Sequence, residues 1–168
     1  MTTQQSDTMR QYCIMMATYN RNANETLYEA CSKLSENDLT ADKGAFFGSI
    51  LATLNHIMVG DDIWMSRFEK TPLPHKQLDA VPYGNFTDLK KARAERDQKF
   101  IAFFKNTDGA FYEGDFAFTS MAGDTFIKPL QQIVAHFFNH QTHHRGQVHT
   151  LLTQAGVKTP VSDLPYIV

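Results

Sequence analysis

The segment HFFNHQTHHRGQVH, residues 136–149, contains five of the seven histidines in this 168-residue chain. An even distribution would place fewer than one histidine in a window of this length. Pro129 suits the first turn of a helix, and Gly156 suits the position just after one. The sequence therefore predicts a final helix of about 26 residues that carries the histidine cluster.

Two of these histidines project toward the interior of the predicted helix packing. At 100° per residue, His140 and His144 lie on the apolar stripe that runs along residues 130–155. Residues one turn apart can bring two imidazole nitrogens to one metal ion, at roughly 2.0–2.1 Å each. The pair thus predicts a metal site, while a hydrogen-bonded buried pair or an exposed histidine-rich turn stays open as an alternative.

The other residues of the segment lie further from this stripe. His136 and His143 are predicted at its edge, where His136 would be a supporting or rim residue. His149 and Phe138 point away from it, toward solvent or a partner. We expect Phe138 to be an exposed aromatic side chain that marks a dimer surface.

A metal site needs further ligands, and His56 is the candidate outside the segment. It lies in the middle of a predicted helix between Leu54 and Met58, where a solvated histidine is unexpected. A lone histidine in that setting is also typical of a hydrogen-bonded core residue. His75 follows Pro74 in a predicted loop, and we expect it to be exposed.

Several other chemistries are disfavoured by the residues present. The spacing H-Q-T-H-H matches the zinc-peptidase motif H-E-x-x-H, but Gln141 replaces the glutamate that acts as general base. The Glu-x-x-His pairs of di-iron bundles are missing, as are a G-x-S-x-G nucleophile elbow and a glycine-rich phosphate loop. No histidine is near either cysteine in the sequence, which leaves thiol catalysis unsupported.

The rest of the chain predicts an all-α fold. Three further helices are indicated by apolar residues at helical spacing, and alternating residues before Pro129 predict a short β-hairpin. Ser35–Asp38 is interpreted as a turn and the tail around Asp163–Pro165 as irregular. The predicted segments are helices at 8–34, 49–68 and 85–104, a crossover containing Pro72 and Gly84, and a hairpin over 116–127. Four long helices with a long middle crossover predict a four-helix bundle.

Composition limits the functional class. Residues 1–168 fit a single domain, and a formal charge of −2 disfavours nucleic-acid or anionic-membrane binding by bulk charge. No apolar stretch approaches the length of a membrane span, and Met1–Asp7 does not resemble a signal peptide. Cys13 and Cys31 would lie about 27 Å apart on one helix, too far for a disulfide. We therefore expect reduced thiols and a cytoplasmic protein.

Two blocks of the sequence resemble the DinB superfamily. Phe47–Ile50 with Leu54–His56 and Asp62–Arg67 is similar to its second helix, and Asn139–His149 to its last helix. The resemblance implies a bundle in up-down-down-up order, commonly assembled as a homodimer. It also implies a divalent-metal site formed by His56, His140 and His144, with Zn²⁺ or Ni²⁺ as the expected ion.

The resemblance predicts the metal ligands more specifically than it predicts the reaction. Thiol-cofactor-dependent transferases and isomerases belong to this superfamily, so we expect an enzyme that activates a low-molecular-weight thiol or water for attack on a small electrophile. A metal-dependent hydrolase and a non-catalytic metal- or ligand-binding stress protein are the alternatives. The neighbours to consider are Asp61, Asp62, Trp64, Arg67, Arg93, Arg96, Asp97, Asn139 and Gln147. For Arg93 and Arg96, ion pairing across helices is the expected role, and for Trp64 core packing.

Overall fold

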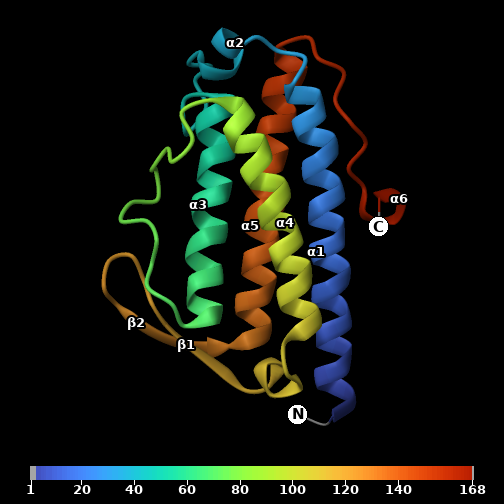
Figure 1. The fold of residues 1–168 in the computed structure, drawn as a ribbon, viewed down its shortest axis with the longest axis vertical. Helices are drawn as coiled ribbons and strands as arrows, with labels where there is room; N and C mark the ends of the chain where they lie inside the picture. Colours follow the sequence, from blue (N-terminus) through green and yellow to red (C-terminus); the bar gives the residue numbers. More distant parts are fainter. Residues whose placement is uncertain (1–2, 168) are drawn as a thin grey trace.

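The computed structural model describes residues 3–167, and four long helices dominate it. They are α1 (Thr3–Cys31), α3 (Ile50–Glu69), α4 (Phe86–Asn106) and α5 (Leu130–Gln154). Figure 1 shows α1 and α5 running in one direction and α3 and α4 in the other. The predicted all-α four-helix bundle in up-down-down-up order is confirmed.

Shorter elements lie between and after the long helices. They are α2 (Glu36–Thr40), η1 (Gly109–Tyr112), β1 (Asp115–Thr119), β2 (Thr125–Pro129) and α6 (Leu164–Ile167). β1 and β2 form an antiparallel hairpin in which Phe118 lies opposite Phe126. The hairpin lies at the end of the bundle where α3 ends and α5 begins (Figure 1). The predicted hairpin before the last helix is thus confirmed.

Local capping explains where the long helices begin and end. The Ser49 hydroxyl accepts a hydrogen bond from the amide of Ala52, and the Asn85 side chain accepts one from Asp88. Lys70 closes α3 in a left-handed conformation, and Gly156 has φ +76° just beyond α5. These caps are close to the bounds predicted from the sequence, whereas α1 begins at Thr3 and ends at Cys31 rather than spanning 8–34.

Two short α-helices were missed by the sequence interpretation, as was the 3-10 helix η1. Ser35–Asp38, interpreted from the sequence as a turn, is the start of α2. Ser35 and Asp38 accept hydrogen bonds from each other's backbone amides and so form a capping box. The tail read as irregular contains α6 at Leu164–Ile167. Both are single turns, too short to show a helical hydrophobic period.

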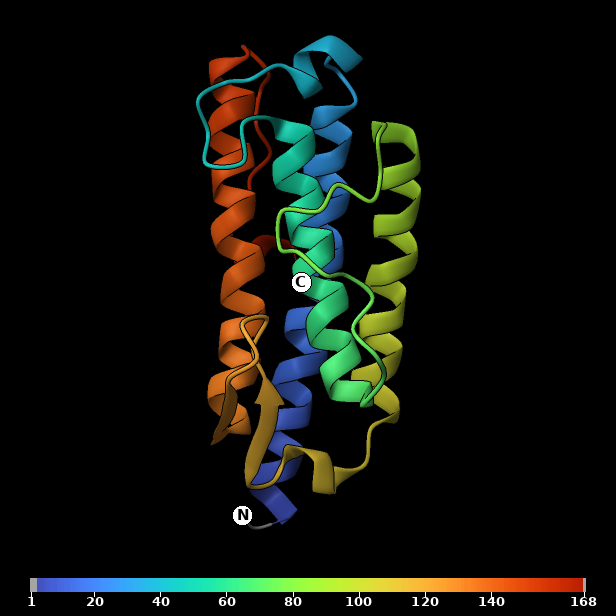
Figure 2. The same ribbon diagram turned by 90° about the vertical axis from the view of Figure 1, so that its left-hand side faces the viewer.

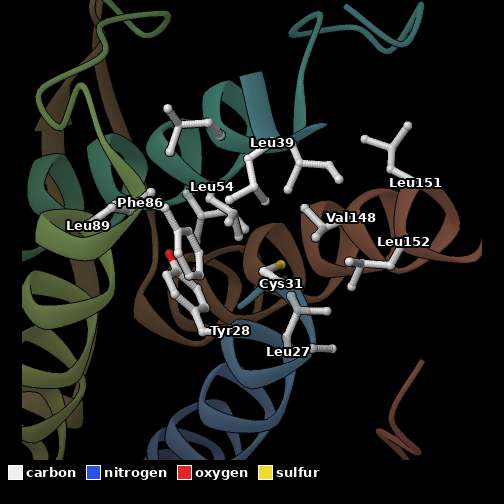
Figure 3. Close-up of a cluster of buried hydrophobic side chains, with 14 of the residues drawn as sticks. Leu27, Tyr28, Cys31, Leu39, Leu54, Phe86, Leu89, Val148, Leu151 and Leu152 are labelled. Carbon is white, nitrogen blue, oxygen red and sulfur yellow. The ribbon is translucent and has the colours of Figure 1, made fainter. Parts of the chain in front are cut away.

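The apolar core is divided into two clusters along the bundle axis. One lies at the α2 end and includes Leu54, Phe86 and Leu152 (Figure 3). The other lies at the hairpin end and is rich in phenylalanine, including Phe104 and Phe137. Between them each long helix contributes buried polar residues, among them Asn24, Asp61, Arg93, Asp97, Gln141 and Arg145. A polar layer therefore crosses the middle of the bundle.

The predicted exposure of Phe138 is wrong. Its side chain is 1% exposed and packs against Tyr12 of α1 and Phe104 of α4, with ring centroids 6.2 and 5.8 Å away. The cause is that α5 packs against both α1 and α3, so more than one stripe of the helix is buried. Phe138 cannot mark a dimer surface, and homodimer formation stays a prediction.

The crossover, residues 70–85, returns along the outside of α3 (Figure 2). Asn55 fastens one end of it, since its side chain donates to the Tyr83 carbonyl and accepts from the Tyr83 amide, both at 3.0 Å. His75 contacts a carboxylate oxygen of Asp62 at 2.8 Å. The expected exposure of His75 is therefore wrong, because this contact draws its side chain down onto α3.

The cysteines and the lengths of the helices bear on the chain as a whole. Cys13 and Cys31 are buried and free, as their separation predicted. Within residues 3–167, no helix combines the length and apolar character needed to cross a bilayer.

Candidate metal centre

Three histidines from two antiparallel helices meet on the outer side of α3 and α5. His56 comes from α3, and His140 and His144 come from successive turns of α5. One ring nitrogen from each lies within 4.8 Å of the other two. The Nε2 atoms of His56 and His140 are 3.1 Å apart. The structure thus brings together the three residues singled out from the sequence.

Two of the rings are held by hydrogen bonds at their outer nitrogens. His56 Nδ1 donates to the carbonyl of Leu78 at 2.8 Å, and His144 Nδ1 donates to Oε1 of Gln147 at 2.8 Å. We assign these tautomers because carbonyl oxygens only accept. The assignment leaves the Nε2 lone pairs of both rings free to bind a metal ion. Such outer hydrogen bonds are typical of metal-binding histidines.

Burial keeps the three imidazoles neutral. Desolvation lowers the pKa of His56 and of His144, although their hydrogen bonds to Leu78 and Gln147 partly oppose the shift. Desolvation and then repulsion from the neighbouring histidines lower the pKa of His140 from 6.5 to about 3. Neutral imidazole is the form that binds metal ions. The cluster is therefore in its ligating form at neutral pH.

The donor atoms fit a small divalent ion. Two nitrogens bound to one tetrahedral ion at about 2.1 Å are separated by roughly 3.4 Å, close to the 3.1 Å between His56 and His140. The same contact is also the length of a hydrogen bond from His140 to His56, so the buried-pair alternative shares this geometry. A nitrogen of His144 lies beside that pair. A bound metal ion explains why a third imidazole is there, whereas a hydrogen-bonded pair does not.

Gly60 makes room for the His140 ring. A Cβ atom on Gly60 would lie 2.7 Å from Cε1 of His140, closer than real Cβ atoms approach, and 3.2 Å from its Nδ1, an unusually tight contact. Gly60 follows His56 by one helical turn, so the ring of His140 lies against bare backbone beside its partner ligand. The sequence interpretation missed this residue, although a glycine inside a helix four residues after a candidate ligand was the available signal.

Phe47 covers one side of the cluster. Its ring stacks on His56 with centroids 4.0 Å apart and planes 22° apart, and it meets His144 edge-on at 5.6 Å. Gly48, with φ +77°, forms the tight turn that places Phe47 just before α3. Phe47 was part of the family resemblance, but no role for it followed from the sequence.

The other side opens into a pocket of about 540 Å³. His56, Gly60 and His140 form its inner end, and residues of α3, the crossover and the hairpin form its walls. His136 lies in this wall, 5.3 Å from Trp64 and 6.0 Å from His140 between ring centroids. Trp64 is buried as expected, but one part of it also faces the pocket.

The polar layer lies on the interior side of the cluster. Gln141 is fully buried and donates to Asp61 at 2.5 Å, so it faces away from the three histidines. Asp61 also pairs with Arg93 at 2.5 Å, and Arg93 with Asp97 at 2.8 Å. Burial raises the pKa of Asp61 to about 6, against the opposing attraction of Arg93.

The remaining candidates have structural contacts. Arg96 pairs with Asp62, which also receives His75, so both arginines of α4 form ion pairs across helices as expected. Asn139 is exposed. His143 lies 3.4 Å from Nε2 of Gln147, and its ring meets that of His144 edge-on with centroids 4.8 Å apart. His149 lies on the α1 side of α5, away from the cluster, as its helix angle predicted.

Comparison with known proteins identifies relatives over nearly the whole chain. The model of the DinB family matches residues 3–167. The curated protein named Protein DinB, from Bacillus subtilis (strain 168), is 20% identical over 161 residues, which cover 92% of this chain and 92% of that protein.

Proposed function

This chain belongs to the DinB family, and from that premise we propose that it is a metal-dependent enzyme whose divalent ion is held by His56, His140 and His144. The observation that carries the proposal is the convergence of three neutral imidazoles, two of which, those of His56 and His140, line a pocket. Zn²⁺ and Ni²⁺ are the ions we expect, because both are well served by imidazole ligands.

An open coordination position favours catalysis over a purely structural ion. Among residues 3–167, the group of possible ligands around this point consists of the three histidines alone, without a carboxylate or thiolate. Structural zinc sites are usually closed by four protein ligands, whereas catalytic sites keep one position free. When bound, an ion with three protein ligands lowers the pKa of a small thiol or water and supplies a nucleophile near neutral pH.

The protein's own residues position and shield this chemistry. Leu78 and Gln147 hold the rings of His56 and His144, and Phe47 excludes water from one side. The pocket admits a small electrophile from the other side. We propose transfer of a low-molecular-weight thiol, or of water, to that electrophile, in a cytoplasmic protein that assembles as a homodimer.

Metal titration of matched variants tests the site. We expect His144→Ala to reduce the affinity for Zn²⁺ or Ni²⁺ by at least about 100-fold, because a ligand is removed rather than its support. His149→Ala, on the other side of α5, should bind the ion as the parent protein does. Circular dichroism should show unchanged helix content in both variants. Full metal occupancy in His144→Ala would contradict the proposal.

A thermal-shift screen then separates the reaction classes. A panel of cellular thiols is tested against metal-loaded and metal-free protein. A thiol that raises the melting temperature of only the loaded form supports thiol transfer. If none does, a hydrolase and a non-catalytic binding protein are separated by assaying the loaded protein for ester and amide hydrolysis.

A further inference from the structure

Arg67 is an unpaired cation in the wall of the pocket. It follows Trp64 by one turn of α3 and is partly buried. Among residues 3–167 no carboxylate lies within ion-pair distance of it, whereas Arg93 and Arg96 each pair with an aspartate. Burial lowers the pKa of Arg67 with no carboxylate to oppose the shift, while Asp97 and Asp61 raise that of Arg93. The positive charge of Arg67 is therefore left without a counter-charge.

The guanidinium is nevertheless held in a fixed position. It lies over the ring of Trp64 at 4.5 Å and the ring of Phe118 at 5.1 Å. Its Nη2 donates to the Thr119 carbonyl at 2.9 Å, while its buried Nε has no hydrogen-bond partner within the described part of the chain. Because Nε is shielded from solvent, an acceptor in the pocket would meet the other guanidinium donors, which the two rings hold in place.

The rest of the pocket favours an apolar ligand without cationic groups. Its walls are largely aliphatic and aromatic, with Ile63, Trp64, Leu78, Phe118 and Met121 among them. Within residues 3–167, its lining contains no aspartate or glutamate, so nothing in it would pair with a cation. A volume of about 540 Å³ lies in the range of pockets that enclose drug-sized molecules.

Arg67 and the metal ligands lie at opposite ends of this pocket. His56, Gly60, Trp64 and Arg67 share one face of α3, at intervals of three or four residues. Arg67 lies eleven positions after His56 on this helix, which corresponds to a rise of about 16 Å. A ligand that reaches both ends must therefore be elongated.

We propose that Arg67 is the anion-binding residue of this pocket and that the substrate is an elongated, mainly apolar or aromatic molecule with a carboxylate at the end remote from the three histidines. That this ligand is the enzyme's substrate rests on the proposed function. The recognition itself depends only on Arg67 and the pocket walls, so it can be measured without a metal ion.

The single tryptophan of the chain gives a direct signal, because Trp64 lies in the pocket wall. The probes are 4-biphenylacetate and its uncharged counterpart 4-biphenylacetamide, titrated against metal-free and metal-loaded protein while Trp64 fluorescence is followed. We expect the carboxylate to bind at least about tenfold more tightly than the amide, the difference that a charge-assisted hydrogen bond supplies.

Arg67→Gln should reduce this preference to about twofold or less in both metal states. Arg21→Gln, which removes the same charge from α1 on the opposite side of the bundle, should retain it. Equal binding of the two probes by the parent protein would overturn the proposal, as would an unchanged preference in Arg67→Gln. If Arg67→Gln does not fold, Arg67→Lys replaces it, and loss of the preference despite the retained charge would overturn recognition by charge.

The outcome is separable from that of the metal proposal. A carboxylate preference that depends on Arg67 in a protein that binds no metal supports the anion site and contradicts the proposed reaction. Normal metal binding without any carboxylate preference supports the metal site and contradicts the anion site.

Discussion

Gly60 controls how closely α3 and α5 approach at the histidine cluster. The His140 ring occupies the space that any other side chain would need, with Cε1 2.7 Å from the position of an added Cβ. Since both atoms belong to rigid groups, the ring or the helix must move. A displacement of a few tenths of an ångström matters, because ligand nitrogens must lie within about 0.2 Å of their ideal distance.

We therefore expect Gly60→Ala to weaken Zn²⁺ or Ni²⁺ binding by at least about tenfold, although alanine is the better helix former. Gly146→Ala is the matched control, since Gly146 lies in α5 with no atom within 4 Å of an added Cβ. It should leave metal affinity unchanged and stabilise the fold by up to about 1 kcal/mol. Competition against a chelating dye measures the affinities, and parent-like binding by Gly60→Ala would contradict the steric argument.

Each helix of the site has two functional faces. On α3, Gly60 lies against the histidine cluster, while the next residue, Asp61, belongs to the polar layer. On α5, His140 belongs to the cluster and the next residue, Gln141, to the polar layer. Because consecutive residues on a helix point about 100° apart, the ligands sit outward while their neighbours join the helices inside. The hydrogen bond from Gln141 to Asp61 ties the two ligand-bearing helices together.

Removing one partner of the buried Asp61–Arg93 pair should be costly. Both side chains are at most 2% exposed. An uncompensated buried charge typically costs about 3–5 kcal/mol, so we expect Arg93→Met to destabilise the protein by that amount. Combining it with Asp61→Leu should recover only part of the loss, because the second buried partner of Arg93, Asp97, is still left without that cation. Urea unfolding measures both variants.

The exposed pair of Lys90 with Glu29 serves as the comparison. Lys90→Gln should leave the unfolding midpoint nearly unchanged, since solvent screens such pairs. If Lys90→Gln and Arg93→Met were equally destabilising, burial would not explain the importance of Arg93.

At the level of elements, the sequence predicted those features that depend on local residues. Ser49, Asn85 and Gly156 correctly indicated helix ends, because capping is decided within a few residues. The helix angles correctly placed His140 and His144 on one side of α5, but that side meets α3 at the outside of the bundle, and Gln141 faces the interior instead. Phe138 was misplaced because one helix cannot reveal how many neighbours it has, and His75 because its partner Asp62 lies on a different element.

Over the whole molecule, the three clustered histidines couple stability to pH. Their folded-state pKa values lie below the usual 6.5, and that of His140 is about 3. At a pH between a histidine's lowered folded-state pKa and 6.5, the unfolded chain binds more protons than the folded one. The stability contributed by these groups is therefore present above pH 6.5 and is lost as the pH falls toward 3.

Comparison of metal-free parent protein with His140→Gln isolates the contribution of His140 from those of Asp61 and other acids. We expect the parent to lose more stability than the variant as the pH falls from 6.5, with an extra slope of at most about 1.4 kcal/mol per pH unit. Urea unfolding at a series of pH values measures the two curves. Parallel curves would show that His140 titrates normally in the folded protein.

The histidine cluster is assembled from segments that are far apart in the chain, and the crossover is one of them. Its Leu78 carbonyl fixes the ring of His56, while Tyr83 and His75 fasten the same connection to α3. By thermodynamic reciprocity, binding of the proposed ion would steady residues 70–85 by the same free energy with which an anchored crossover would strengthen ligation. Sequence changes in this proline-containing connection would then alter metal affinity without altering any ligand.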